Sequence, residues 1–144
     1  MPSALVTSTN KIAVASFLTL AACTQTNAAL MDNSVHLAPT CPDAVKIYTT
    51  PAAVGNSYVE VALLNSAGST GVTTEAGMMK SMRKKAADVG ANGIIMGNIN
   101  EPGAGAKVAA AIFGTAAERK GKSVAIFVAA DSARVSRVCV ASKS

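Results

Sequence analysis

Few residues of this chain are of a type that could do chemistry. It contains three cysteines, Cys23, Cys41 and Cys139, a single histidine, His36, and eight acidic residues scattered along the sequence. No histidine follows position 36, so the rest of the chain cannot assemble a Ser-His-Asp or Cys-His arrangement. Glu60 is the one carboxylate whose place in a strand could face a cleft, although we expect it to face solvent. We therefore predict a protein that is not an enzyme and needs no cofactor.

Cys23 lies directly after a segment with the layout of a secretory signal. Lys11 precedes the apolar run from Ile12 to Leu20, and small residues follow that run. The sequence Leu-Ala-Ala-Cys at 20–23 resembles the lipobox of bacterial lipoproteins. This resemblance implies cleavage just before Cys23, a thioether-linked diacylglycerol on its sulfur and an acylated new N-terminus. We accordingly expect residues 1–22 to be a lipoprotein signal peptide, and the membrane to be bound through the lipid on Cys23.

Other interpretations of Cys23 stay open. Ordinary secretory cleavage could follow Ala28, or the apolar run could remain as a membrane anchor, although it is about half of the ~20 residues that a span needs. A buried cysteine in a cytosolic protein fits the Thr- and Ser-rich flanks poorly. Thr24 stands where an aspartate would signal inner-membrane retention in enteric bacteria. By that analogy we expect a cell-envelope protein with an outer-membrane lipid anchor facing the periplasm.

Cys41 and Cys139 remain as a pair if Cys23 carries lipid. An even number of cysteines in an exported protein indicates a disulfide. These two lie near the start and the end of the mature chain, so their bond would close nearly the whole domain into one loop. Two free thiols are one alternative, and a metal pair is another that lacks further ligands. We predict a Cys41–Cys139 disulfide and no metal site, with His36 an ordinary surface residue.

The composition is that of one small domain. The chain has 144 residues, half of them hydrophobic but only 3% aromatic, so the core must be aliphatic, with alanine at close contacts. A net charge of +5 favours anionic surfaces without specifying a ligand. The scarcity of aromatic side chains argues against nucleic acid as a partner. Residues 23–40 show no sustained periodicity and are predicted to be a lipidated tether, which leaves 41–144 as a single α/β domain.

Strand-like and helix-like segments alternate along that domain. Four runs of β-forming residues predict strands, at 45–48, 58–64, 93–99 and 122–128. We expect the first two to pair antiparallel, and the last to lie beside the second or the third. The small polar stretch 65–71 predicts a loop, and 135–140 could be a last strand or a short helix. The fold class predicted is α+β, a small mixed sheet of four to five strands with two helices packed on one face.

The first helix is predicted over 74–89. Thr74 is a preferred N-cap, and Gly90 is suited to end the helix in a left-handed conformation. Met78 or Met79, then Met82, Ala86 and Val89, follow at spacings of three and four residues and form one apolar face. The other side carries four cations, which we expect to bind a partner: Lys80, Arg83, Lys84 and Lys85.

The segment 104–119 has three interpretations. Val108, Ile112, Phe113 and Ala116 share one side of a helix, which predicts a short amphipathic helix lying on the domain. A flexible insertion is an alternative. A segment that faces lipid or a partner protein is another, because the continuous apolar part is about a third to a half of a bilayer span.

Residues 86–95, Ala-Ala-Asp-Val-Gly-Ala-Asn-Gly-Ile-Ile, resemble a signature of small bacterial envelope domains. These include the Rcs-type stress-sensor lipoproteins and the YbjQ-like domains described as heavy-metal binding. The resemblance covers about 45–100 and implies an α/β plan in which Gly90 turns the chain while Ala91 and Gly93 let helix and strand approach closely. The sensor lipoproteins have four domain cysteines, whereas this domain has two. The signature carries no catalytic group, and no ligand cluster here matches the metal description.

These observations predict an outer-membrane-anchored envelope lipoprotein that acts as a non-enzymatic interaction or stress-sensing module. Its expected partner is an envelope protein that contacts the basic helix or the loops beside it, and an oligomer is possible. The alternative is a small-ligand or metal-binding oligomeric domain of the YbjQ type. An enzyme of unrecognised type is a third.

Overall fold

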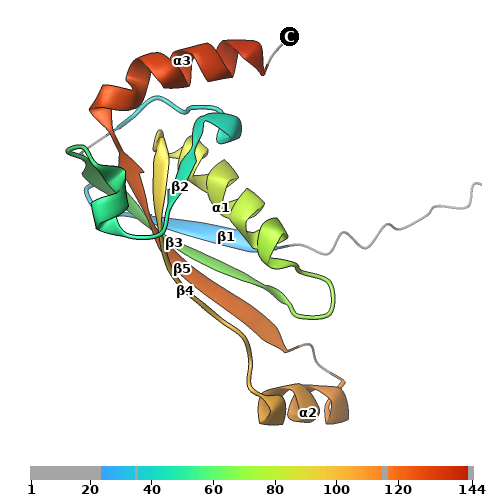
Figure 1. Ribbon diagram of the computed structural model, residues 1–144. Helices are drawn as coiled ribbons and strands as arrows, with labels where there is room; N and C mark the ends of the chain where they lie inside the picture. Colours follow the sequence, from blue (N-terminus) through green and yellow to red (C-terminus); the bar gives the residue numbers. More distant parts are fainter. Residues whose placement is uncertain (1–23, 35, 115–116, 143–144) are drawn as a thin grey trace, which may run out of the picture.

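One five-stranded mixed sheet organises the molecule (Figure 1). In this computed structural model, residues 24–34, 36–114 and 117–142 are described. The strands are β1 (Gln25–Leu30), β2 (Lys46–Tyr48), β3 (Val59–Ser69), β4 (Gly93–Asn100) and β5 (Glu118–Phe127). The helices are α1 (Glu75–Asp88), α2 (Ala104–Ile112) and α3 (Ser132–Ala141), with short 3₁₀ turns η1 (Pro42–Ala44), η2 (Pro51–Val54) and η3 (Ala129–Asp131). The α+β class and the mixed sheet are confirmed.

The strand order is β1-β3-β5-β4-β2, with β5 antiparallel to both of its neighbours. The strand predicted at 122–128 therefore lies beside both candidates at once. The expected antiparallel pairing of the first two predicted strands is wrong, because β2 pairs in parallel with β4 at the far edge. The connection between β2 and β3 forms η2 instead of a hairpin turn. The predicted loop at 65–71 is also wrong up to Ser69, since β3 continues between two paired neighbours.

A strand replaces part of the predicted tether, at Gln25–Leu30. β1 pairs antiparallel with β3, from Gln25 opposite Ala67 to Leu30 opposite Ala62. The hydroxyl of Thr26 donates to that of Ser66 at 3.1 Å and lies 2.7 Å from that of Ser81 in α1. A hydrophobic period cannot indicate such a strand, because its residues are small and polar and hydroxyl contacts hold it. The folded domain thus begins by residue 25, well before 41.

α1 covers one face of the sheet, and the main core lies beneath it. Met78, Met82 and Ala86 are fully buried, as predicted. Met82 and Ala86 pack in one core cluster with Leu64 and Ile94 of the sheet. Thr74 is the N-cap, its hydroxyl accepting from the backbone N–H of Gly77 at 3.1 Å. A second, smaller cluster on the other face consists of Val54 of η2, Ile95, Ile126 and Val128.

The geometry of the chain after α1 depends on two glycines, Gly90 and Gly93. Gly90 has a φ of +79°, so the predicted left-handed turn is confirmed. A Cβ on Gly93 would lie 2.9 Å from the side chains of Ile126 in β5 and Tyr48 in β2, so this glycine makes room for side chains of the two neighbouring strands and not, as expected, for a helix. Both positions are dictated by packing and backbone conformation.

The remaining helices differ from the expectation of two helices on one face. α2 buries none of its residues and stands at the tip of the β4–β5 ribbon, away from α1 (Figure 1). α3 resolves the open choice at 135–140 in favour of a helix and lies at the opposite end of the sheet. No helix in the described ranges is both long enough and apolar enough to cross a bilayer.

Candidate functional site

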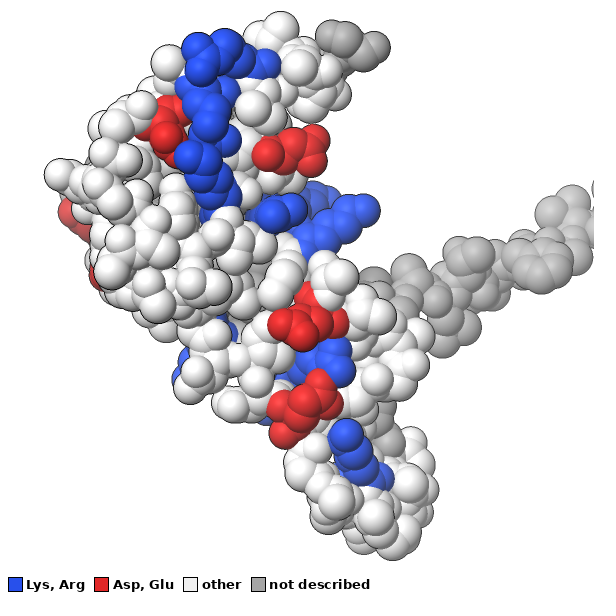
Figure 2. Space-filling view, viewed as in Figure 1, with Lys and Arg blue, Asp and Glu red and all other residues white. Residues whose placement is uncertain are grey.

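The basic residues predicted on α1 form an exposed surface. Lys80, Arg83 and Lys84 are exposed at spacings of three and four, so they share one side of the helix, whereas Lys85 is half-buried and turned away. Figure 2 shows Lys and Arg side chains gathered over this part of the molecule. Within the part of the chain that the structure describes, none of the four has an ion-pair partner. Their charges are therefore available to a ligand.

Two of these cations line a cavity of about 360 Å³. Lys80 and Arg83 form its basic wall, and Asp43 of η1 lies across from α1. Apolar side chains, among them Ile47 and Met79, complete the lining. We call this cavity the basic cleft, with the following lining residues: Pro42, Asp43, Ile47, Ala76, Met79, Lys80 and Arg83.

Only two of the four cations predicted to bind a partner, Lys80 and Arg83, line the basic cleft. Lys84 and Lys85 do not line the basic cleft, while Asp43 and Ile47, which sequence reasoning missed, do. No periodicity could have found these two, because they reach α1 through the fold of η1 and β2. The cleft can hold an acidic group next to an apolar one. It contains no histidine, cysteine or pair of carboxylates that could move a proton or attack a substrate.

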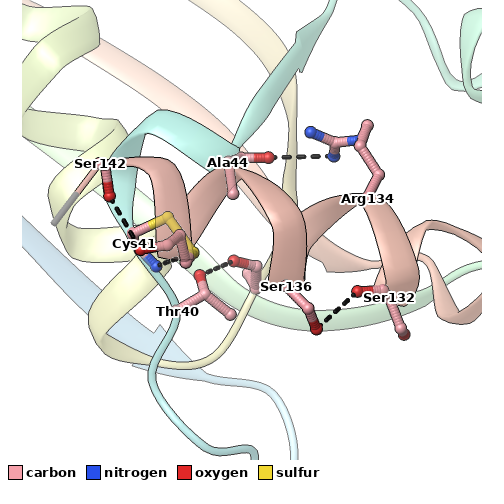
Figure 3. The surroundings of a disulfide bond; sticks show 9 residues. Thr40, Cys41, Ala44, Ser132, Arg134, Ser136 and Ser142 are labelled. Atoms are coloured by element: carbon pink, nitrogen blue, oxygen red, sulfur yellow. Dashed lines mark hydrogen bonds between the residues drawn. A yellow bond between two sulfur atoms is a disulfide. The ribbon is translucent and has the colours of Figure 1, made fainter. Parts of the chain in front are cut away.

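The predicted disulfide is confirmed. Cys41 and Cys139 are bonded, with their Cα atoms 5.4 Å apart and a sequence separation of 98 residues. The backbone N–H of Cys41 lies 3.2 Å from the sulfur of Cys139 (Figure 3). The bond ties α3 to the start of η1. Because Pro42 and Asp43 of η1 line the basic cleft, the disulfide also holds one wall of that cleft in place.

A charged cluster at the start of α3 reinforces this attachment. Asp131 accepts from Lys46 at 2.9 Å and from Arg134 at 3.0 Å, and Arg134 also donates to the carbonyl of Ala44 in η1 at 3.0 Å (Figure 3). The hydrogen bond from Lys46, with Arg134 adding to it, holds the pKa of Asp131 below its ordinary value despite partial desolvation. The charged groups of this cluster therefore pair with one another and stabilise the attachment of α3 to η1.

Asp131→Asn is expected to lower the free energy of unfolding by about 0.5 to 1 kcal/mol at neutral pH, the upper part of the range for ion pairs at a protein surface, because Asp131 is only partly exposed. Because the folded-state pKa is depressed from 3.8, the carboxylate stabilises the fold above that pH, and this contribution is lost as pH falls through the lower folded value. Urea titrations at neutral pH measure this destabilisation, and titrations well below pH 3.8 measure its loss at acid pH. A wild-type advantage that stays constant at acid pH would contradict this account. Asp88→Asn, at an exposed position, is the control.

The other predicted site residues lie apart from the basic cleft. His36 and Glu60 are both exposed, as expected. Cys23 and residues 1–22, which were predicted to be a signal peptide, lie outside the described residues. Among the described residues, no group of three or more His, Cys, Asp or Glu side chains is placed to hold a metal ion.

No protein-family model and no curated protein matches the chain. Among solved structures, the fold is similar to that of the Francisella virulence factor FvfA, known from an orthorhombic crystal form. The TM-score is 0.50 at 18% identity, covering 71% of this chain and 96% of that one. The likeness is one of fold. At this identity, the similarity shows that the α+β arrangement has a known architecture, and it assigns no role to any residue of the basic cleft.

Proposed function

We propose that this protein is a bacterial envelope lipoprotein, anchored by a diacylglycerol on Cys23 to the outer membrane, that binds an envelope protein without catalysing a reaction. The anchor is supported by the Leu-Ala-Ala-Cys sequence behind an apolar run. The disulfide supports an oxidising compartment, where such bonds persist.

The observation that carries the binding role is the basic cleft. Lys80 and Arg83 have no ion pair in the described chain, and they border a cavity whose lining is also apolar. A partner segment that combines a carboxylate with an aliphatic side chain matches this lining. Exposed cations of this kind contribute mainly through encounter rate and specificity, and the apolar lining contributes burial. We therefore propose an acidic segment of an envelope protein as the occupant.

The anchor is tested by the intact mass of the protein purified from membranes. We expect a chain that begins at Cys23 and carries diacylglycerol and an N-terminal acyl group. Cys23→Ser should abolish both the added mass and the membrane fraction. A precursor cut elsewhere, with the Cys23 thiol bare, would refute the anchor.

The cleft is tested with two charge reversals on the same helix. Lys80→Glu with Arg83→Glu should reduce, by about tenfold or more, the yield of an adduct formed in cells by a photo-crosslinker at Ala76, since two charge contacts of about 0.7 kcal/mol each suffice. Lys84→Glu with Lys85→Glu makes the same charge change outside the cleft and should alter the yield little. Equal losses from the two pairs would show that only the general charge of α1 matters. No loss from either would reject the cleft as the binding site.

A further inference from the structure

The described chain exposes large apolar side chains at α2. Val108, Ile112 and the C-cap residue Phe113 are 59%, 73% and 78% exposed. Ala110 alone among the residues of α2 is partly buried. At about 100° per residue, Val108 and Ile112 lie on the side of the helix opposite Ala110. The apolar side of α2 is therefore turned away from the body of the protein.

α2 lies at the end of the sheet where the chain enters from Cys23. Gln25 at the start of β1 is opposite Ala67, which is opposite Lys120 near the start of β5. The entry point and the β5 end that α2 precedes are thus two strands apart, about 10 Å. Figure 1 shows α2 beyond the tip of β4 and β5.

Another exposed apolar residue, Val72, lies at the same end of the sheet as α2. Val72, in the turn that follows β3, is 65% exposed. Close to it, the hydroxyl of Thr24 donates to that of Thr73 at 3.4 Å, so the first described residue is already fastened to this turn. The charges around α2 are largely paired, since Glu101 contacts both Lys107 and Arg119. This end therefore presents apolar side chains with little net charge between them.

We propose that α2 and the Val72 turn insert into the headgroup layer of the membrane beside the lipid on Cys23. This inference rests on the proposed lipidation. Only Thr24 separates Cys23 from the sheet, so a lipid there would bring the bilayer against this end of the domain and against no other. An exposed apolar helix at a bilayer surface lies in the interface, with its apolar side buried about 5 to 10 Å. A single lipid attachment leaves a domain free to rotate, whereas this second contact fixes its orientation.

Tryptophan fluorescence of the lipidated, full mature protein tests the insertion, because the chain has no native tryptophan. Phe113→Trp is reconstituted in vesicles of phosphatidylethanolamine and phosphatidylglycerol, with and without phospholipids brominated near the headgroup. We expect a blue-shifted emission that the brominated lipids quench. Val108→Ser with Ile112→Ser in the same background should abolish both effects while the lipid keeps the protein on the vesicles.

Val59→Trp is the matched control, since Val59 is 56% exposed and lies toward the opposite end of β3. Its emission should stay unquenched. An unquenched tryptophan at 113 in protein whose mass includes the lipid would overturn the insertion and leave the anchor intact. Equal quenching at both positions would also overturn it, because it would mean that no end of the domain is preferred. A bare Cys23 thiol, seen by mass, is the separate failure of the anchor itself.

Discussion

Replacing Cys41 and Cys139 with serine is expected to lower the free energy of unfolding by about 3 to 5 kcal/mol. The bond spans 98 positions, so its loss releases nearly the whole domain from a closed loop in the unfolded state. In the folded state the substitution removes a covalent attachment of α3 to η1 and leaves the hydrogen bond from Arg134 to the carbonyl of Ala44. The urea midpoint of the mature chain carrying Cys23→Ser measures the effect.

Reduction provides the matched control for this prediction. With dithiothreitol, the parent chain should unfold at the midpoint of the serine variant, and the variant itself should not respond. Limited proteolysis should also cut first within α3 once the bond is absent, because that helix loses its strongest attachment. Equal midpoints for the oxidised parent and the variant would contradict the stabilising role.

The basic cleft should loosen in the same variant. Pro42 and Asp43 follow Cys41 directly and form the wall that faces α1. Freedom of η1 would reduce the pre-organisation of that wall, and pre-organisation is what limits the entropy lost on binding. If the proposed binding role is correct, the disulfide therefore contributes to the pre-organisation of the cleft as well as to stability.

The sequence was sufficient to predict the elements whose signals are local. α1 has its N-cap at Thr74, its apolar spacing and its terminal Gly90 in one continuous segment, and all three are where the pattern indicated. The disulfide followed from counting cysteines and from their places near the two ends. Neither inference required knowledge of which strands lie side by side.

The parts that were missed depend on contacts between distant residues. β1 is a strand because β3 offers a free edge and because Ser66 and Ser81 bind Thr26, none of which a local period records. β2 lies at the edge next to β4 because β5, which comes last in sequence, separates β3 from β4. The basic cleft also depends on this topology. Its basic wall lies within α1 and could be predicted locally, whereas the η1 wall is brought to α1 only by the fold.

Asn92 is the most informative residue that was overlooked. It lies within the segment that resembles the envelope-domain signature, where only its small neighbours received a role. Its side chain is buried and accepts from the backbone N–H of Val128 at 2.8 Å while donating to the carbonyl of Val128 at 2.9 Å. Its backbone N–H donates to the carbonyl of Ile126 at 3.0 Å. A lone amide before an apolar strand is the signal that could have identified it.

Asn92→Ala is therefore expected to lower the free energy of unfolding by about 1 to 3 kcal/mol, because it leaves the buried backbone N–H of Val128 without a partner, while the carbonyl of Val128 keeps the backbone N–H of Asp131 at 3.1 Å. Asn92→Asp should also destabilise, since the carboxylate can still accept from the N–H but faces a carbonyl where the amide donated. Urea unfolding measures both variants against Asn98→Ala, an exposed asparagine in β4 that should change stability by no more than about 0.5 kcal/mol. If Asn92→Ala cost as little as Asn98→Ala, the side chain would not be holding the end of β5 to the start of β4, and the connection from there to α3 and the disulfide would need another explanation.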